Sequence, residues 1–267
     1  MLGAVALLLA AAPAAMGDAF TPEHAGGSRN ADGIHTLFVI AMILGGLIFV
    51  LVEGVLITAL IRFRRRRGGP EAAQIRGNTP LEIGWTLGAA AIIVALAVIT
   101  FVYLGDIRTP EASKAGTVQV ASLHQPKVPG GKALRVVVTG QQYLWRFEYP
   151  GKEQVFSYHD MYVPVGATVT LKIRSSDVAH SWWIPQLGGK ADAIPGHTND
   201  SWFQVDRPGT FYGECAELCG ENHADMRARV IALPPARFQA WLRRQAADIR
   251  EAQAQLSLSR KIRGEGS

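Results

Sequence analysis

The stretch TVTLKIR, residues 168–174, decides the fold of the C-terminal part of the chain. Val169, Leu171 and Ile173 alternate with polar residues, and this period of two is typical of a strand with one buried face. ALRVVVTG (residues 133–140) and YLWRFEYP (residues 143–150) have the same character, bounded by Gly and Pro. Short strands and turn signals continue to about residue 233, so we predict an antiparallel β-sandwich or barrel.

The stretch GECAELCGENHADM, residues 213–226, holds the only two cysteines of the chain, Cys215 and Cys219, followed by His223 and Met226. Thiolate and thioether are soft ligands that favour copper, and imidazole binds copper in either oxidation state. A first histidine ligand is expected from another strand, and His180 in DVAHSWWIP follows directly after TVTLKIR and its two serines. The spacing therefore favours a copper site.

Two other interpretations of the cysteines remain open on the residues alone. A disulfide is the ordinary fate of cysteines in an exported domain, although a bridge at this spacing closes a very small loop and stabilises little. Two unrelated buried thiols are the other alternative.

Two apolar stretches precede the predicted strands, at about residues 34–61 and 83–104. Each is long enough to cross a hydrocarbon core of ~30 Å at ~1.5 Å per residue. The run RFRRRR (residues 62–67) lies between them and places the connecting loop in the cytoplasm, so everything after residue 105 is expected outside. The run accounts for much of the formal charge of +5, and we expect no nucleic-acid partner.

These patterns predict four parts. Residues 1–18 look like a secretory signal peptide, with an apolar core and small residues near a cleavage site. Residues 19–105 form an N-terminal segment and a transmembrane helix hairpin, and residues 106–234 an exported β-domain. Residues 235–267 form a C-terminal helix or tail, in which Phe238, Trp241 and Leu242 make one apolar stripe.

At this point the chain resembles the cytochrome c oxidase subunit II family, which belongs to the haem–copper oxidases. GECAELCGENHADM is similar to the loop of that family's binuclear copper A (CuA) centre, and the likeness continues through DVAHSWWIPQLGGKADAIPG, the helix hairpin and YLWRFEY. It covers nearly the whole chain after the signal segment. The resemblance implies a cupredoxin-like Greek-key β-barrel outside the membrane.

The resemblance also implies roles for the ligand residues. Cys215 and Cys219 would bridge two copper ions, His180 and Met226 would complete one ion, and His223 and the backbone carbonyl of Glu217 the other. The Glu217 side chain would help to bind a Mg²⁺ ion shared with subunit I.

Three further residues are candidates through the family. Tyr143 stands where relatives carry the tryptophan that receives electrons from cytochrome c, which is a departure from the family pattern, and Trp145 is the second candidate. Glu82, three residues before Trp85, matches a glutamate at the entrance of a proton channel of subunit I, although an acid at a helix start has an ordinary structural role as well.

The sequence is therefore interpreted as subunit II of a cytochrome c oxidase in a bacterial inner membrane, with its copper domain on the periplasmic side. It would accept electrons from cytochrome c and pass them to haem in subunit I, within a complex that also holds subunit III, reduces oxygen to water and pumps protons. The sequence has no Cys-x-x-Cys-His haem attachment, so the donor is expected to be a separate protein. The alternatives are the CuA subunit of a nitric-oxide reductase and a copper-free quinol-oxidase-type subunit, which lacks the ligand cysteines.

Overall fold

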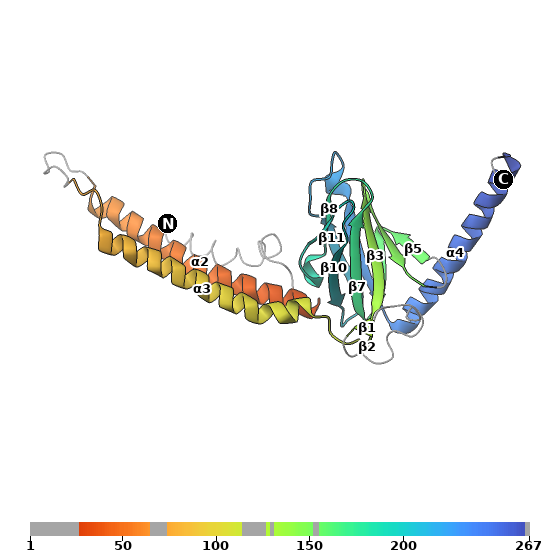
Figure 1. Ribbon diagram of the computed structural model, residues 1–267, viewed down its shortest axis with the longest axis horizontal. Helices are drawn as coiled ribbons and strands as arrows, with labels where there is room; N and C mark the ends of the chain where they lie inside the picture. Colours follow the sequence, from red (N-terminus) through yellow and green to blue (C-terminus); the bar gives the residue numbers. More distant parts are fainter. Residues whose placement is uncertain (1–26, 65–73, 114–126, 129–130, 152–154, 265–267) are drawn as a thin grey trace, which may run out of the picture. The chain divides into compact units, whose positions relative to one another are not determined.

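The computed structural model describes residues 27–64, 74–113, 127–128, 131–151 and 155–264 (Figure 1). The predicted signal peptide lies outside these residues. The chain divides into two compact units, one of residues 36–105 and one holding the rest of the described chain.

Two long apolar helices, α2 (Arg29–Arg62) and α3 (Thr79–Arg108), come first among the described elements. Both are long and apolar enough to cross a membrane, and the most apolar segment of each helix is not buried by the rest of the described chain. Large side chains such as Leu60 and Phe101 are 75% exposed, as expected for helices that meet lipid or partner helices. At the start of α3, Asn78 Oδ1 accepts a hydrogen bond from the N–H of Leu81, which is the ordinary N-terminal cap of a helix.

The β-domain contains two five-stranded sheets, ordered β10-β7-β3-β4-β5 and β6-β12-β11-β8-β9, and a short β1-β2 pair. The bounds of the strands are β1 Lys127–Val128, β2 Gly131–Lys132, β3 Leu134–Gln141, β4 Leu144–Tyr149, β5 Val155–Tyr158, β6 Asp160–Pro164, β7 Thr168–Ser175, β8 His180–Trp183, β9 Ala191–Ala193, β10 Asn199–Gln204, β11 Gly209–Cys215 and β12 Arg227–Leu233. Two short 3-10 helices lie in the connections between strands: η1 (Pro185–Leu187) between β8 and β9, and η2 (His223–Asp225) between β11 and β12. The predicted all-β, cupredoxin-like domain, which follows two apolar helices in the sequence, is confirmed.

The prediction that the sheets are antiparallel was wrong at two pairs. Strand β3 runs parallel to β7, and β12 runs parallel to β6, while the other strand pairs of the two large sheets are antiparallel. Alternation along a strand reports which face is buried and carries no information about the direction of its neighbour. The two sheets are therefore mixed.

The core lies between the two sheets and is built from alternate residues of their strands. Trp145 and Phe147 on β4 and Phe203 on β10 are fully buried. Helix α4 (Pro235–Ile262) covers one end of this core, where Trp241 stacks on Tyr162 with ring centroids 4.4 Å apart. The apolar stripe predicted for this helix is confirmed: Phe238 and Trp241 are buried, and the half-buried Leu242 packs against the core.

Candidate metal centre

The five predicted ligand residues come from two places in the β-domain. His180 begins β8, whereas Cys215 ends β11 and begins a loop that carries Cys219, His223 and Met226 back to β12. The N–H of Cys215 donates to the carbonyl oxygen of Met226 across the base of this loop, at 2.9 Å. Backbone pairing of Cys215 with Trp182 on β8 then brings the loop beside His180.

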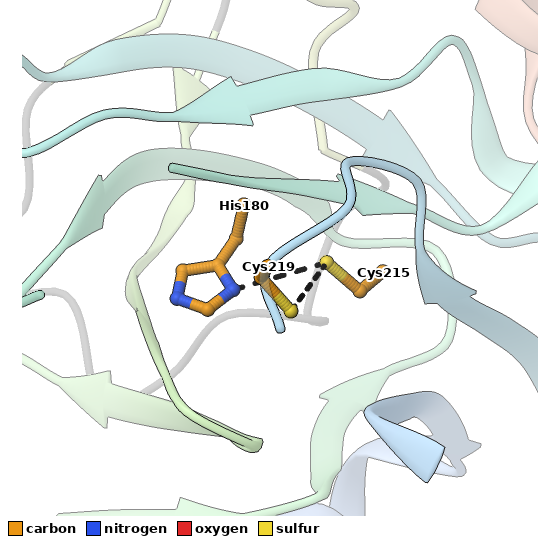
Figure 2. A group of neighbouring side chains, drawn as sticks. All are labelled: His180, Cys215 and Cys219. Atoms are coloured by element: carbon orange, nitrogen blue, oxygen red, sulfur yellow. Dashed lines mark hydrogen bonds between the residues drawn. The ribbon is translucent and has the colours of Figure 1, made fainter. Parts of the chain in front are cut away.

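The side chains of these residues converge on one point of the domain. The Cys215 and Cys219 sulfurs are 3.9 Å apart, and His180 Nδ1 lies 3.9 Å from Cys215 Sγ (Figure 2). On the other side, Cys219 Sγ lies 3.6 Å from His223 Nδ1 and 3.8 Å from Met226 Sδ. The structure thus brings together all five side chains that the sequence singled out.

Burial separates the centre from water. His180 and Met226 are fully buried, and the Cys215 and Cys219 side chains are nearly so, whereas His223 is half-buried. Both cysteines are free, so the disulfide considered above is not formed. Burial, the nearby Cys215 and a hydrogen bond between the two thiols raise the pKa of Cys219 to about 11. A metal that binds here must therefore displace a proton from a thiol.

The donor set fits copper. Two thiols and an imidazole nitrogen all lie within 4.8 Å of one another, and a thioether adjoins them. Thiolate and thioether select soft metal ions, and imidazole suits copper. The carbonyl oxygen of Glu217 lies 3.2 Å from Cys215 Sγ, which also places this backbone oxygen beside the cluster.

The His180 ring is held on several sides. Its Nε2 lies 2.8 Å from Asp177 Oδ1, and the Trp145 ring meets it edge-on with centroids 5.9 Å apart. A Cβ on Gly140 would lie 2.9 Å from His180 Cδ2, so only glycine leaves room for the ring there. Burial opposes ionisation of Asp177, but hydrogen bonds from the Gln142 N–H, His180 and the Val178 N–H outweigh it and lower the pKa of this carboxyl.

The other predicted residues lie apart from the five side chains of the cluster or at its edge. Tyr143 is half-buried, and its hydroxyl accepts a hydrogen bond from the N–H of Glu221 in the ligand loop, at 3.1 Å. Trp145 is fully buried against His180, and its Nε1 has no hydrogen-bond partner among the described residues. The Glu217 side chain is exposed, and within the described residues it joins no group of three or more His, Cys, Asp or Glu ligands.

Glu82 belongs to the other unit, at the start of α3. Its Oε1 accepts a hydrogen bond from the N–H of Asn78 at 3.0 Å, so its carboxylate takes part in capping the helix. This contact gives Glu82 a structural role.

Comparison with known proteins agrees with the geometry. The family described as "Cytochrome C oxidase subunit II, periplasmic domain" matches residues 155–233, and its transmembrane domain matches residues 18–102. Cytochrome c oxidase subunit 2 of Thermostichus vulcanus is 34% identical over 85% of this chain and 78% of its own length. The chain belongs to the cytochrome c oxidase subunit II family. The two apolar helices and the transmembrane match make it a membrane-anchored member.

Two further similarities were found. The subunit 2 of Alkalihalophilus pseudofirmus is 35% identical over 83% of this chain, and the matched region spans 61% of that relative's length. A crystal structure of the periplasmic domain of subunit II from Bradyrhizobium japonicum is 30% identical, with a TM-score of 0.42, over 43% of this chain and 94% of that one.

Sequence reasoning missed the residues that surround the ligands, above all Asp177, Gln142 and Gly140. Asp177 precedes His180 by three residues in DVAH, a local signal that could have been used. Gln142 and Gly140 give no such signal, because their contacts with the candidate ligands join positions 40 or more residues apart, from Gln142 to Cys219 and from Gly140 to His180.

Proposed function

We propose that this chain is the electron-accepting subunit of a cytochrome c oxidase. It would take single electrons from cytochrome c at a CuA centre and pass them to haem in subunit I. Reduction of oxygen to water, coupled to proton pumping, would be carried out by the assembled complex with subunits I and III. The observation that carries the proposal is the buried convergence of two free thiols, two imidazoles and a thioether.

The residues would hold the two copper ions as follows. Cys215 and Cys219 would hold both ions, His180 and Met226 would help to hold one of them, and His223 and the backbone carbonyl of Glu217 would help to hold the other. When bound by these residues, copper would supply one-electron redox chemistry. The chain would contribute a largely buried site whose ligands are held by two strands and one short closed loop. Because these elements fix the ligands, the ligand positions would change little when the charge of the centre changes.

Tyr143 is the proposed arrival point of electrons, because it is half-buried and its hydroxyl contacts the ligand loop. The fully buried Trp145 would act behind it, through its contact with His180. The carboxylate of Glu217 is exposed and would bind Mg²⁺ only together with ligands from subunit I. Glu82 is proposed to lead protons into subunit I in addition to its role as a cap.

The proposed location is a bacterial inner membrane, crossed by α2 and α3, with the copper domain on the periplasmic side. The arginines at residues 62 and 64–67 between the two helices support this orientation. The presence of both cysteines and His180 in one cluster argues against a copper-free quinol-oxidase-type subunit. The match to the cytochrome c oxidase family favours an oxidase subunit over a nitric-oxide reductase subunit.

The experiment uses the full chain, purified in detergent and loaded with copper. We expect two copper ions per chain and a seven-line electron-spin-resonance signal from one electron shared by both. His223→Ala should abolish that signal, whereas His197→Ala, which changes an exposed histidine outside the cluster, should leave it intact. A wild-type chain that binds no copper after reduction and reloading would refute the proposal.

A further inference from the structure

We propose that Asp177 and Gln142 form a bridge that fixes the spacing between His180 and Cys219 before copper binds. The inference rests on the proposed function, because its purpose is to preorganise the copper site. Asp177 and Gln142 are positioning residues: each acts on the metal through a ligand residue. The bridge links three segments that are distant in sequence, namely the loop before β8, the turn between β3 and β4, and the ligand loop.

The first half of the bridge orients the His180 ring. Asp177 Oδ1 lies 2.8 Å from His180 Nε2, and an ionised carboxylate can only accept hydrogen bonds. His180 Nε2 must then carry the proton, which leaves the lone pair on Nδ1, the nitrogen that faces Cys215 Sγ. The carboxylate is itself anchored by the N–H groups of Gln142 and Val178, each at 2.7 Å. Asp177 therefore sets both the tautomer and the direction of the ring.

The second half connects the same carboxylate to the ligand loop. The backbone N–H of Gln142 donates to Asp177 Oδ2, and its side-chain Nε2 donates to the carbonyl oxygen of Cys219 at 2.6 Å. One residue thus holds the partner of His180 with its backbone and the backbone of Cys219 with its side chain. The neighbouring Tyr143 hydroxyl adds a contact with the N–H of Glu221.

Gly220 provides independent support for this arrangement. Its φ of +136° lies in a region that favours glycine, and a Cβ there would come within 2.9 Å of Gln142 Nε2 and 2.6 Å of the Tyr143 hydroxyl. A larger residue would displace the ends of the Gln142 and Tyr143 side chains from the ligand loop. The residue directly after Cys219 is therefore one that allows the bridge to close.

Loss of either residue should loosen the copper site by an amount that depends on the bonds removed. Changes to residues that orient metal ligands typically weaken metal binding about 10- to 100-fold, and we expect this range for Asp177→Ala. Gln142→Ala removes one neutral side-chain hydrogen bond and should weaken binding about two- to tenfold. Because both act through one bridge, the double variant should lose less than the product of the two single effects.

The test measures the rate of copper loss to excess chelator, the reduction potential and the electron-spin-resonance hyperfine splitting in the full chain in detergent. Asp177→Ala, Gln142→Ala and the double variant are compared with Asp248→Ala and Gln255→Ala, which change exposed residues of α4. We expect faster copper loss and shifts of the potential and splitting in the bridge variants alone. Asp177→Asn, which keeps an oxygen for His180, should restore part of the wild-type behaviour and replaces Asp177→Ala if that variant does not fold.

Wild-type values for all three quantities in both single variants would overturn the bridge and leave the proposed function standing. Effects that multiply fully in the double variant would also overturn it, because the two residues would then act separately.

A second readout needs no copper, so it decides the inference even if the proposed function fails. Amide hydrogen exchange of residues 216–226 in the metal-free chain should become about tenfold faster in Asp177→Ala and Gln142→Ala, since the Gln142 side chain holds the carbonyl of Cys219 and Asp177 holds Gln142 in place. Unchanged exchange in both variants would refute the bridge.

Discussion

The Gly140→Ala substitution tests whether His180 is held by packing as tightly as the structure indicates. An added Cβ would lie 2.9 Å from His180 Cδ2 and 3.1 Å from Trp145 Cζ3, and both rings are fully buried. Restoring ordinary contact requires a shift of about 0.5 Å, the difference between 2.9 Å and the 3.4 Å at which such contact begins. Overpacking of this kind costs about 1–3 kcal/mol.

For a unit of this size, 1 kcal/mol corresponds to about 2–4 °C in Tm, so Gly140→Ala should lower the Tm by about 2 to 12 °C. The assay is thermal unfolding of the metal-free chain in detergent, followed by near-ultraviolet circular dichroism of the buried aromatic side chains. The loaded variant should also show a shifted copper spectrum, because functional sites tolerate displacements of only ~0.5 Å.

Gly209→Ala is the matched control, because it adds the same methyl group in a strand of the same domain, where the nearest atom would be 4.0 Å away. We expect its Tm and copper spectrum to stay close to those of the wild type. A Gly140→Ala variant with the Tm and spectrum of the wild type would refute the packing argument around His180.

Three other outcomes are expected. Burial is the largest of several causes that raise the pKa of Tyr149 above its ordinary value of 10.0. The stability that the protonated phenol contributes is therefore present below about pH 10 and is lost as the pH rises further. Measurements of the free energy of unfolding between pH 8 and 11 should show this loss, and Tyr149→Phe should make the free energy of unfolding depend less on pH. Glu82→Gln keeps an acceptor for the N–H of Asn78 but cannot ionise, so the helix should remain while proton uptake by the assembled complex slows; unchanged uptake would leave only the capping role. Gly213→Ala would place a Cβ 2.0 Å from the carbonyl oxygen of Trp183, so the chain should lose its cooperative unfolding transition, and a variant with wild-type melting would contradict the pairing of β11 with β8.

The grouping of the five candidate ligands could be predicted from the sequence because the chemistry of their side chains limits their possible roles. Cys215, Cys219, His223 and Met226 fall within twelve residues, and no other cysteines compete with them. His180 could be found because it follows soon after the most regular strand. In each case the residue type limited the possible roles, and the structure then brought the side chains together.

The remaining features depend on distances that no local pattern encodes. The parallel pairing of β3 with β7 depends on the topology of the whole domain. The alternation of apolar and polar residues along a strand fixes only which face of the strand is buried. Likewise, the contact of Gln142 with Cys219 joins residues 77 positions apart, and glutamine is common on protein surfaces. Glu82 was recognised as a helix-start acid, but its partner Asn78 became visible only in the folded helix.

Three glycines show where separate segments of the chain must come close together around the candidate ligands. Gly140 lies against the His180 ring, Gly213 precedes Cys215 by two residues at a close approach to β8, and Gly220 follows Cys219 beneath the turn that contains Gln142. At each position a Cβ would meet an atom at less than 3.0 Å, so each glycine marks a place where another segment must come close to a ligand. Ligand chemistry alone describes what the site binds, whereas these glycines describe how tightly three separate segments must approach to build it. The candidate metal site and its glycines are therefore one feature of the fold, and substituting the glycines should disturb metal binding without removing any candidate ligand.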